Sequence, residues 1–261
     1  MKPRWTASLG AMAVCAQLVG CNETLPTGSE LAAGTLGTQA ADKKLDLDVC
    51  SPGAGGFTTA STNPYFPLAV GDRWHYLGEE DDVAVELLIT VLDMTRTIDG
   101  VTTRIVEERE WEDDELLEVS WNYFVQAGDG TICYFGEDVD IFEDEEISHE
   151  GAWCADDAGN APGIIMPADP RPGMTYQNEL APGIAEDAAK IVGIGPITVP
   201  AGTFTETIRV RESNPLDGDK GYKVFAAGTG LIVDEVLKLE SYAHGAAAPG
   251  PPIPTDQTCG I

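Results

Sequence analysis

The stretch Val83–Trp111, VAVELLITVLDMTRTIDGVTTRIVEEREW, decides the fold. Apolar side chains fill every second position from Val83 to Val91, which is the period of a half-buried strand. Asp99-Gly100 follows, a dipeptide that readily takes positive φ in a tight hairpin turn, and Val101–Trp111 then resumes a strand-like pattern. The stretch therefore predicts two antiparallel strands joined by a short turn.

Strand-like segments separated by turn residues continue on both sides of this hairpin. Upstream, Trp74 and Tyr76 alternate in a short strand, and downstream Asp129-Gly130 turns the chain into another. The remaining expected strands are Leu116–Val125, Thr131–Phe135, Lys190–Val199, Phe204–Glu212, Gly221–Ala226 and Leu231–Tyr242. Hairpin signals at this spacing predict one all-β domain of about nine to eleven strands. We expect a single curved antiparallel sheet or open barrel, with a long irregular loop, residues 143–187, over one face.

The N-terminus reads as an export signal. Basic residues precede the apolar run Ala7–Val19, whose length is typical of a signal peptide and too short for a permanent transmembrane helix. The run leads into Leu-Val-Gly-Cys at residues 18–21, which resembles the lipobox of bacterial lipoproteins. That resemblance implies lipid attachment at Cys21, and Asn22 in place of Asp after it implies the outer membrane. The alternative is an ordinary secretory signal in which Cys21 carries no lipid.

Three segments follow from this interpretation. Residues 1–20 are the expected signal peptide, and residues 21–49 are the expected lipidated cysteine and flexible tether, because they are rich in Thr, Gly, Ala and Ser and have no aromatic residue. Residues 50–261 are the expected β domain, with its core in 63–242 and a Pro-rich extended tail in 245–261. This length suffices for one well-buried domain.

Four cysteines remain for disulfides once the signal is removed and Cys21 is lipidated. They allow three pairings in an oxidising compartment. We favour Cys133 with Cys154, which would close the acidic loop between them, and Cys50 with Cys259, which would join the ends of the domain. A zinc site is the weaker interpretation, because no C-x-x-C spacing occurs and the three histidines are scattered.

The chain is strongly acidic. Its formal net charge is −29, and loss of Lys2 and Arg4 with the signal makes it −31, from 13 basic and 44 acidic residues. So negative a field argues against nucleic acid and against anionic membrane surfaces as partners, and it permits cationic partners or metal ions. Residues 107–150 hold 17 acidic residues against Arg109 alone, although solubility explains such acidity as well as a binding site does.

Several segments together resemble a known group of proteins. The chain reads NPYFPLAVGDRWHY at residues 63–76, PAGTF at 200–204 and YKVFAAGTG at 222–230. These resemble a broad family of bacterial secreted and lipoprotein β domains that open with an F-P-L-x-x-G-x-x-W-x-Y-like segment. The resemblance covers about residues 63–240 and implies an extracytoplasmic β fold. It carries over no activity and no catalytic residue.

Three carboxylates are candidate catalytic groups: Glu137, Glu179 and Glu186. Two carboxylates that face each other across a cleft can differ in pKa and act as general acid and base, as they do in glycosidases. Glu137 would act with Glu179 or with Glu186. For Glu186 the alternative is an acidic residue that begins a helical turn.

Four aspartates are candidate metal ligands. Asp138 and Asp140 lie two apart on an expected strand and so face one side of it. Asp156 and Asp157 follow in the loop, and oxygen ligands of this kind suit Ca²⁺, the one cofactor that the sequence suggests. No calcium-loop motif is present, so an acidic rim without metal is the alternative.

Tyr134, Trp153, Tyr176 and Asp187 are the candidate ligand-binding residues. They lie in Thr131–Asp187, where Gly- and Pro-rich sequence carries more aromatic and apolar side chains than a solvated loop normally holds. Trp153 and Tyr176 in its irregular part are suited to stacking on a ligand.

No nucleophile triad, phosphate loop or dinucleotide fingerprint is present. We therefore expect an exported, lipid-anchored outer-membrane protein whose β domain is a binding or structural module. Its expected ligand is a divalent cation, a small molecule, a glycan or another cationic partner. The alternative is a carboxylate-dependent hydrolase or lyase whose site lies between the sheet and the 143–187 loop.

Overall fold

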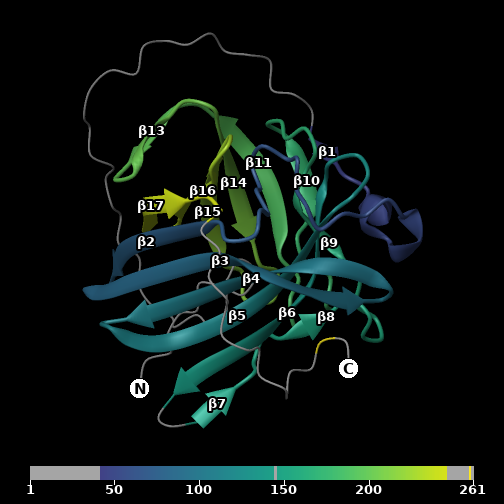
Figure 1. Ribbon diagram of the computed structural model, residues 1–261, viewed down its shortest axis with the longest axis horizontal. Helices are drawn as coiled ribbons and strands as arrows, with labels where there is room; N and C mark the ends of the chain where they lie inside the picture. Colours follow the sequence, from purple (N-terminus) through teal and green to yellow (C-terminus); the bar gives the residue numbers. More distant parts are fainter. Residues whose placement is uncertain (1–41, 144–145, 246–258, 260–261) are drawn as a thin grey trace.

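The computed structural model describes residues 42–143, 146–245 and 259 (Figure 1). This part of the chain consists of strands and two short 3-10 helices, η1 (Leu47–Cys50) and η2 (Pro52–Ala54). The strands are β1 (Lys43–Lys44), β2 (Arg73–Glu80), β3 (Val83–Ile98), β4 (Val101–Glu112), β5 (Glu115–Gln126), β6 (Ile132–Glu143), β7 (Glu146–Ser148), β8 (Trp153–Cys154), β9 (Gly163–Met166), β10 (Met174–Gln177), β11 (Ala188–Ile194), β12 (Ile197–Val199), β13 (Gly202–Phe204), β14 (Thr207–Ser213), β15 (Lys220–Ala226), β16 (Gly230–Asp234) and β17 (Leu237–Ala243). Within the described residues, no helix is long and apolar enough to span a membrane.

One large sheet dominates the fold. Its strand order is β1-β10-β11-β14-β15-β16-β17-β2-β3-β4-β5-β6-β7, with β8 and β9 also paired to β6, and the hairpin β12-β13 stands apart from it. In Figure 1 the strands β2 to β6 run across the molecule, whereas β10, β11 and β14 stand upright beyond them, so the sheet curves strongly. The predicted all-β curved sheet is confirmed. One pair, β1 with β10, is parallel.

Two-residue turns build the meander from β2 to β5. The turn residues Asp81, Asp82, Asp99, Asp113 and Asp114 all have positive φ, a conformation that Asp tolerates better than most residues and that matches the twist of a hairpin. The predicted turn at residues 99–100 is confirmed. The same geometry explains why so many acidic residues lie at hairpin tips.

The C-terminal strands differ from the prediction in one respect. The segment Leu231–Tyr242 is two strands, β16 and β17, because the chain reverses at Glu235, which has a positive φ of 52°. Val233 then pairs with Lys238 and Asp234 with Leu237. Apolar residues at Leu231, Val233, Leu237 and Leu239 continue one alternation on both sides of Glu235, which concealed this reversal.

The segment predicted as a long loop contributes short strands to the sheet. β8 and β9 pair with β6, and β10 pairs with β11. The sheet remains open between β9 and β10, where the backbone N–H of Ala161 donates to the carbonyl of Leu180 over 2.9 Å in an isolated bridge. We call the contact of residues 161–163 with residues 178–180 the seam.

The N-terminal segment 43–50 joins both sides of the seam. Its backbone N–H groups at Lys43 and Leu45 donate to the carbonyls of Gly173 and Thr175, beside and within β10. Its other end, Cys50, is bonded to β6. The predicted tether is therefore too long at its C-terminal end, because ordered pairing begins at Lys43 rather than at residue 50.

The disulfides pair differently from the favoured prediction. Cys50 is bonded to Cys133, and Cys154 to Cys259. The expected Cys133–Cys154 bond is wrong because Cys154 in β8 lies opposite Gly136 of β6. Cys133 is three residues along that strand, roughly 10 Å away at about 3.3 Å per residue, whereas a disulfide needs Cα atoms within about 7 Å.

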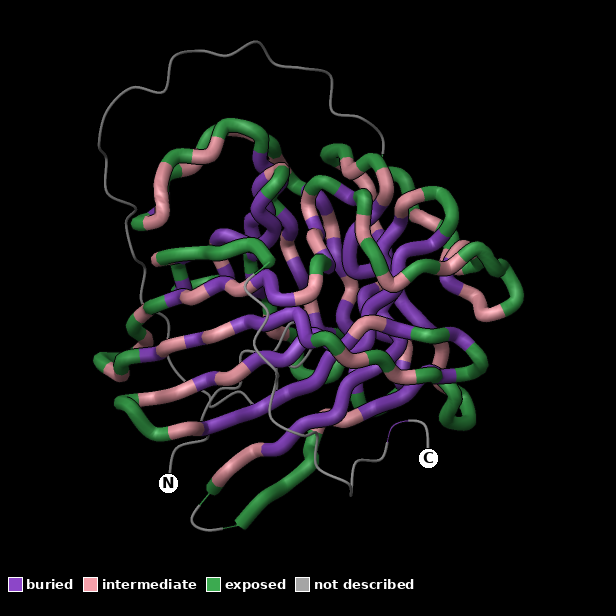
Figure 2. The backbone as a smooth tube through the Cα atoms, viewed as in Figure 1, coloured by how far each residue is buried: buried purple, intermediate pink, exposed green. Residues whose placement is uncertain are grey.

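The core lies between the two halves of the curved sheet. Figure 2 shows buried residues concentrated along the middle of the strands and exposed ones at the hairpin ends. The largest fully buried side chains include Trp153, Tyr76, Tyr123, Tyr134 and Phe124. The interior is therefore filled by aromatic side chains of β2, β5, β6 and β8.

Closure of the seam depends on a glycine. A Cβ atom on Gly163 would lie 1.9 Å from the carbonyl oxygen of Asn178, which is backbone and cannot move aside. We expect Gly163→Ala to lower the free energy of unfolding by about 3 kcal/mol or more, the upper range for overpacking. Thermal and urea unfolding measure it. Gly193→Ala in β11 is the matched control, since its Cβ would have nothing within 4 Å; equal losses in both variants would contradict this account.

Candidate functional site

Strand register places acidic side chains on the interior face of the sheet. Residues directly opposite each other in an antiparallel pair share a face. Glu110 lies opposite Glu118, and Lys223 lies opposite Asp234. Glu137 lies opposite Asn122, two positions before Phe124 of the aromatic core. The polar groups therefore face the space enclosed by the sheet.

We call this group the interior carboxyl cluster. Its members come from β4, β5, β6, β14, β16 and the segment that joins β10 to β11, and each is at most 6 % exposed. They are Glu108, Glu110, Glu118, Glu137, Glu179, Asp187, Glu212 and Asp234. Lys223 is the one buried lysine or arginine among the described residues.

Lys223 neutralises only part of this charge. Its Nζ lies 3.5 Å from Glu212 Oε2 and 3.3 Å from Asp234 Oδ2. Burial lowers the pKa of Lys223, but the two carboxylates outweigh that effect and hold its pKa above the usual value. Asn178 Nδ2 donates a further hydrogen bond of 2.8 Å to Glu212 Oε1. These contacts satisfy Glu212 and Asp234. The charge of Lys223 also acts to lower the pKa of Glu179 and Asp187, but burial and the neighbouring carboxylates outweigh it.

Glu179 is the least compensated member. It is fully buried, and neither of its carboxylate oxygens has a hydrogen-bond partner within the described residues. Burial raises its pKa well above the usual value, and the negative charges of Asp187 and Glu137 raise it further. The charge of Glu137 therefore acts on Glu179, and both carboxylates belong to the interior carboxyl cluster. Glu118 behaves similarly, because burial and Glu110 raise its pKa.

Asp187 joins the cluster, whereas Glu186 does not. Burial, followed by the charge of Glu212, raises the pKa of Asp187 to about 7. Glu186 instead accepts a hydrogen bond of 2.9 Å from the backbone N–H of Gly183, in the exposed turn before β11. The prediction of Glu186 as a partner for Glu137 is therefore wrong. Asp187 lies in the cluster, where Glu186 was expected.

The predicted aromatic residues line the interior but do not form an open stacking platform. Tyr134 donates its hydroxyl to Asn122 Oδ1 and packs edge-on to Trp153, with ring centroids 5.2 Å apart. Both are buried, and Trp153 Nε1 has no hydrogen-bond partner among the described residues. Tyr176 is also buried, and Glu212 contributes to raising the pKa of its hydroxyl after burial.

The four predicted metal ligands do not form one site. Asp138 accepts from Arg96 Nη1 at 3.3 Å, from the Tyr123 hydroxyl and from the Cys259 backbone N–H at 3.1 Å, so both of its oxygens are engaged. Asp140 pairs with His149 over 3.0 Å. Asp156 and Asp157 lie in an exposed turn. Among the described residues there is no group of three or more His, Cys, Asp or Glu that could hold a metal ion.

Sequence reasoning missed Glu108, Glu110, Glu118, Glu212, Lys223 and Asp234. A signal for Glu212 was present, because it continues the alternate positions of Ile208 and Val210 in β14, both buried. A charged residue in the apolar phase of a strand indicates either a strand end or a buried polar group. The partners of Lys223 could not be found in the same way, since they depend on register.

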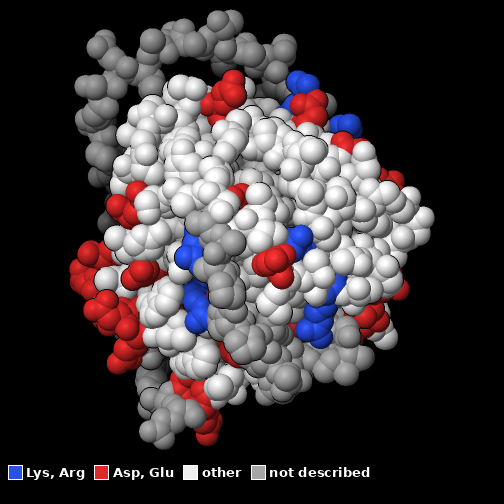
Figure 3. Space-filling model, in the orientation of Figure 1, with Lys and Arg blue, Asp and Glu red and all other residues white. Residues whose placement is uncertain are grey.

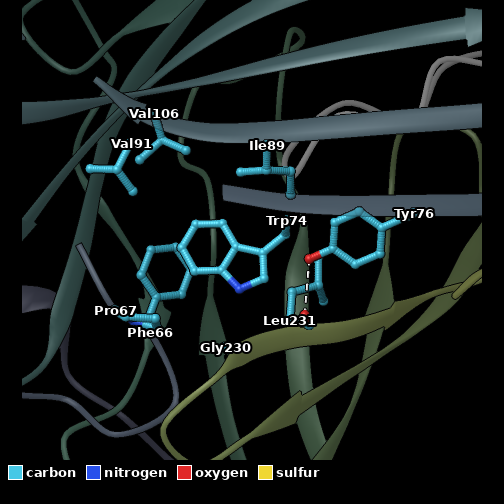
Figure 4. Close-up of a pocket in the computed structure, with 9 residues that line it drawn as sticks. All are labelled: Phe66, Pro67, Trp74, Tyr76, Ile89, Val91, Val106, Gly230 and Leu231. Atoms are coloured by element: carbon cyan, nitrogen blue, oxygen red, sulfur yellow. Dashed lines mark hydrogen bonds between the residues drawn. The ribbon is translucent and has the colours of Figure 1, made fainter. Parts of the chain in front are cut away.

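The opening segment with the family-like pattern has a packing role. Trp74 Nε1 donates to the carbonyl of Thr229 over 2.6 Å, and the Tyr76 hydroxyl donates to the carbonyl of Leu231 over 2.9 Å. Figure 4 shows these side chains around a small apolar pocket of about 30 Å³, room for about one water molecule. It is lined by Phe66, Pro67, Trp74, Tyr76, Ile89, Val91, Val106, Gly230 and Leu231. The two hydrogen bonds hold β2 against β16 and the residue before it.

Comparison with known proteins identified no relative. No protein-family model, no curated protein and no solved structure matches the chain. The resemblance to secreted and lipoprotein β domains therefore stays a prediction.

The elevated pKa of Asp187 makes stability depend on pH. The folded state holds this proton up to about pH 7, whereas an unfolded Asp loses it near its ordinary value of 3.8. The folded state thus binds more protons in this window, and its stability falls as the pH rises through it. Between pH 7 and pH 5 we expect a gain of about 2 kcal/mol, because the slope is about 1.4 kcal/mol per pH unit below the folded pKa and about half of that at it.

Thermal unfolding from pH 5 to pH 8 measures this dependence. Asp187→Asn should remove it in part, since an amide cannot titrate, while Asp156→Asn in the exposed turn after β8 should leave it unchanged. A melting temperature that rises from pH 5 to pH 7 in the unsubstituted chain would contradict the assignment.

Proposed function

We propose that this protein is an exported, lipid-anchored outer-membrane protein whose β domain binds a small cationic ligand at the interior carboxyl cluster. The observation that carries the binding proposal is Glu179, a fully buried carboxylate with no hydrogen-bond partner for either oxygen within the described residues. An amine or guanidinium group supplies both the missing charge and the missing donors.

Energetics support a ligand role for the cluster over a purely structural one. A buried carboxylate without a partner destabilises the fold by several kcal/mol, or else takes up a proton. Selection for stability alone would therefore favour an apolar residue at this position. Groups kept at such a disadvantage are candidates for function, especially where desolvation and nearby charges shift several pKa values together.

The seam gives the cluster a route to solvent. Glu179 lies within the seam itself, one residue from Leu180, whose carbonyl takes part in the isolated bridge to Ala161. Across the seam, β9 is paired with β6, which carries Glu137. Only a short stretch of backbone pairing has to open there, in contrast to the continuous ladders elsewhere in the sheet. We propose that ligand enters at this place.

A carboxylate-dependent hydrolase is the second candidate. The specific observation in its favour is the pair Glu137 and Glu179: burial, then the charge of Asp187 and then that of Glu137 raise the pKa of Glu179, as a general acid requires. We place binding first because both side chains are fully buried, and the catalytic proposal additionally needs a substrate and a water molecule positioned between them.

Removal of Glu179 tests the binding proposal. We expect Glu179→Gln to raise the melting temperature at alkaline pH, where the unsubstituted side chain loses its proton and becomes a buried repulsive charge. Millimolar spermidine or arginine should stabilise the unsubstituted chain, since a ligand specific for the folded state adds stability by mass action. The same additions should leave Glu179→Gln unaffected, and isothermal titration calorimetry measures the binding directly.

Glu186→Gln is the matched control, because it removes one carboxylate from the same segment but outside the cluster. It should keep the response to both amines. A response that survives in Glu179→Gln, or that is absent from the unsubstituted chain, would show that the cluster does not bind such cations.

The anchoring proposal depends on Cys21, which lies outside the described residues. We expect Cys21→Ser to release the protein from the membrane fraction and to abolish incorporation of labelled palmitate, since the thiol is the attachment point for lipid in the resembling lipoproteins. Cys15→Ser, within the expected signal peptide, is the control and should change neither result. Unaltered lipid incorporation in Cys21→Ser would refute the lipobox interpretation.

A further inference from the structure

A row of basic side chains crosses the outward face of the sheet beside its β1 edge. Lys44 lies opposite Thr175, Thr175 opposite Lys190, and Lys190 opposite Arg211, in the strands β1, β10, β11 and β14. Their sequence neighbours Ala189 and Glu212 are buried on the interior face. Because side chains alternate between faces along a strand, the row points away from the interior carboxyl cluster.

The row lines a groove of about 370 Å³, within the range of sites for small molecules. Lys44, Lys190 and Arg211 contribute three positive charges to it, and Asp42 contributes one negative charge, so its lining has a net charge of 3 − 1 = +2. The groove also contains the hydroxyl group of Thr175. A local excess of cations is unexpected in a chain with a net charge of −29.

The cations in the groove are incompletely paired. Lys190 Nζ contacts Asp42 Oδ2 at 2.7 Å. The Arg211 guanidinium makes no hydrogen bond or ion pair with the residues that the structure describes. Like charges directly opposite each other, as at Lys190 and Arg211, destabilise a sheet. An anion between them would remove that repulsion.

Acidic side chains gather elsewhere on the surface. In Figure 3 red atoms collect along the left edge of the molecule, where Figure 1 shows the hairpins β2–β3 and β4–β5. The residues of these tips include Asp81, Asp82, Asp113 and Asp114. They lie in the turns that join β2 to β3 and β4 to β5, and none of these strands pairs with β1, β10 or β11.

We propose that this groove is a binding site for a phosphate group. A phosphate monoester carries about −1.5 to −2 charges at pH 7, which matches the net charge of the groove, whereas a lone carboxylate does not. Arg211 offers a planar fork for two phosphate oxygens, and Lys190 and Lys44 act as point charges. The site faces away from the interior carboxyl cluster and does not depend on the function proposed for that cluster.

Two sources can present such a group: a soluble phosphate and the headgroup of an anionic lipid. The full chain with Cys21→Ser, which cannot be lipidated at that position, is titrated with inorganic phosphate in a phosphate-free buffer by isothermal titration calorimetry. In parallel, it is sedimented with vesicles of phosphatidylcholine alone or with added phosphatidic acid. The difference between the two vesicle types reports the phosphate headgroup, because any other membrane contact is common to both.

Arg211→Gln and Lys190→Gln are the test variants. We expect each to weaken binding by about tenfold or more, because each removes a charge-assisted hydrogen bond. Arg211→Gln breaks no contact with the described residues, so it should keep the melting temperature. Lys238→Gln, which removes an exposed cation from β17, is the matched control and should bind like the unsubstituted chain.

Binding of free phosphate that Arg211→Gln weakens identifies a soluble ligand. A preference for phosphatidic acid vesicles that the same variant abolishes, without binding of free phosphate, identifies a lipid headgroup. Absence of both, or equal losses in Arg211→Gln and Lys238→Gln, overturns the proposal.

Discussion

Within the described residues, more negative charge is buried inside the sheet than Lys223 can neutralise. Eight acidic side chains are buried inside the sheet, and Lys223 contacts two of them, Glu212 and Asp234. A hydrophobic core normally excludes such groups or neutralises them. Here the aromatic side chains of β2, β5 and β6 fill the enclosed volume, and the carboxyl groups lie among them. The protonation state of the interior is thereby tied to the stability of the whole domain.

The topology brings these groups together. The meander from β2 to β6 supplies Glu108, Glu118 and Glu137, and the strands β14 to β16 supply the acidic pair that contacts Lys223. The two sets face each other only because the sheet curves back until β9 meets the segment after β10. The seam is thus the place where the last members of the cluster, Glu179 and Asp187, are added.

Local signals in the sequence predicted the elements of this fold well. The alternation of Val83 to Val91 and the Asp99-Gly100 turn fix a hairpin by short-range sterics alone. The disulfide partners of Cys50 and Cys154 could not be predicted, because they depend on where separate strands attach to β6. Most members of the interior carboxyl cluster could not be predicted for the same reason. The face that Glu108 occupies is set by register with β3 and β5, and no local pattern encodes it.

The segment 43–50 gives the domain a particular mechanical connection. Backbone hydrogen bonds hold it to β10 and its flank, and the bond between Cys50 and Cys133 holds it to β6. Tension arriving through the N-terminal side of the chain therefore loads these weak bonds first and a covalent bond second. The short β1 pairing can yield reversibly while the disulfide passes the load directly into β6, which pairs along its length with β5 and on its other side with β7, β8 and β9. The attachment thus acts as a compliant link in series with a rigid one.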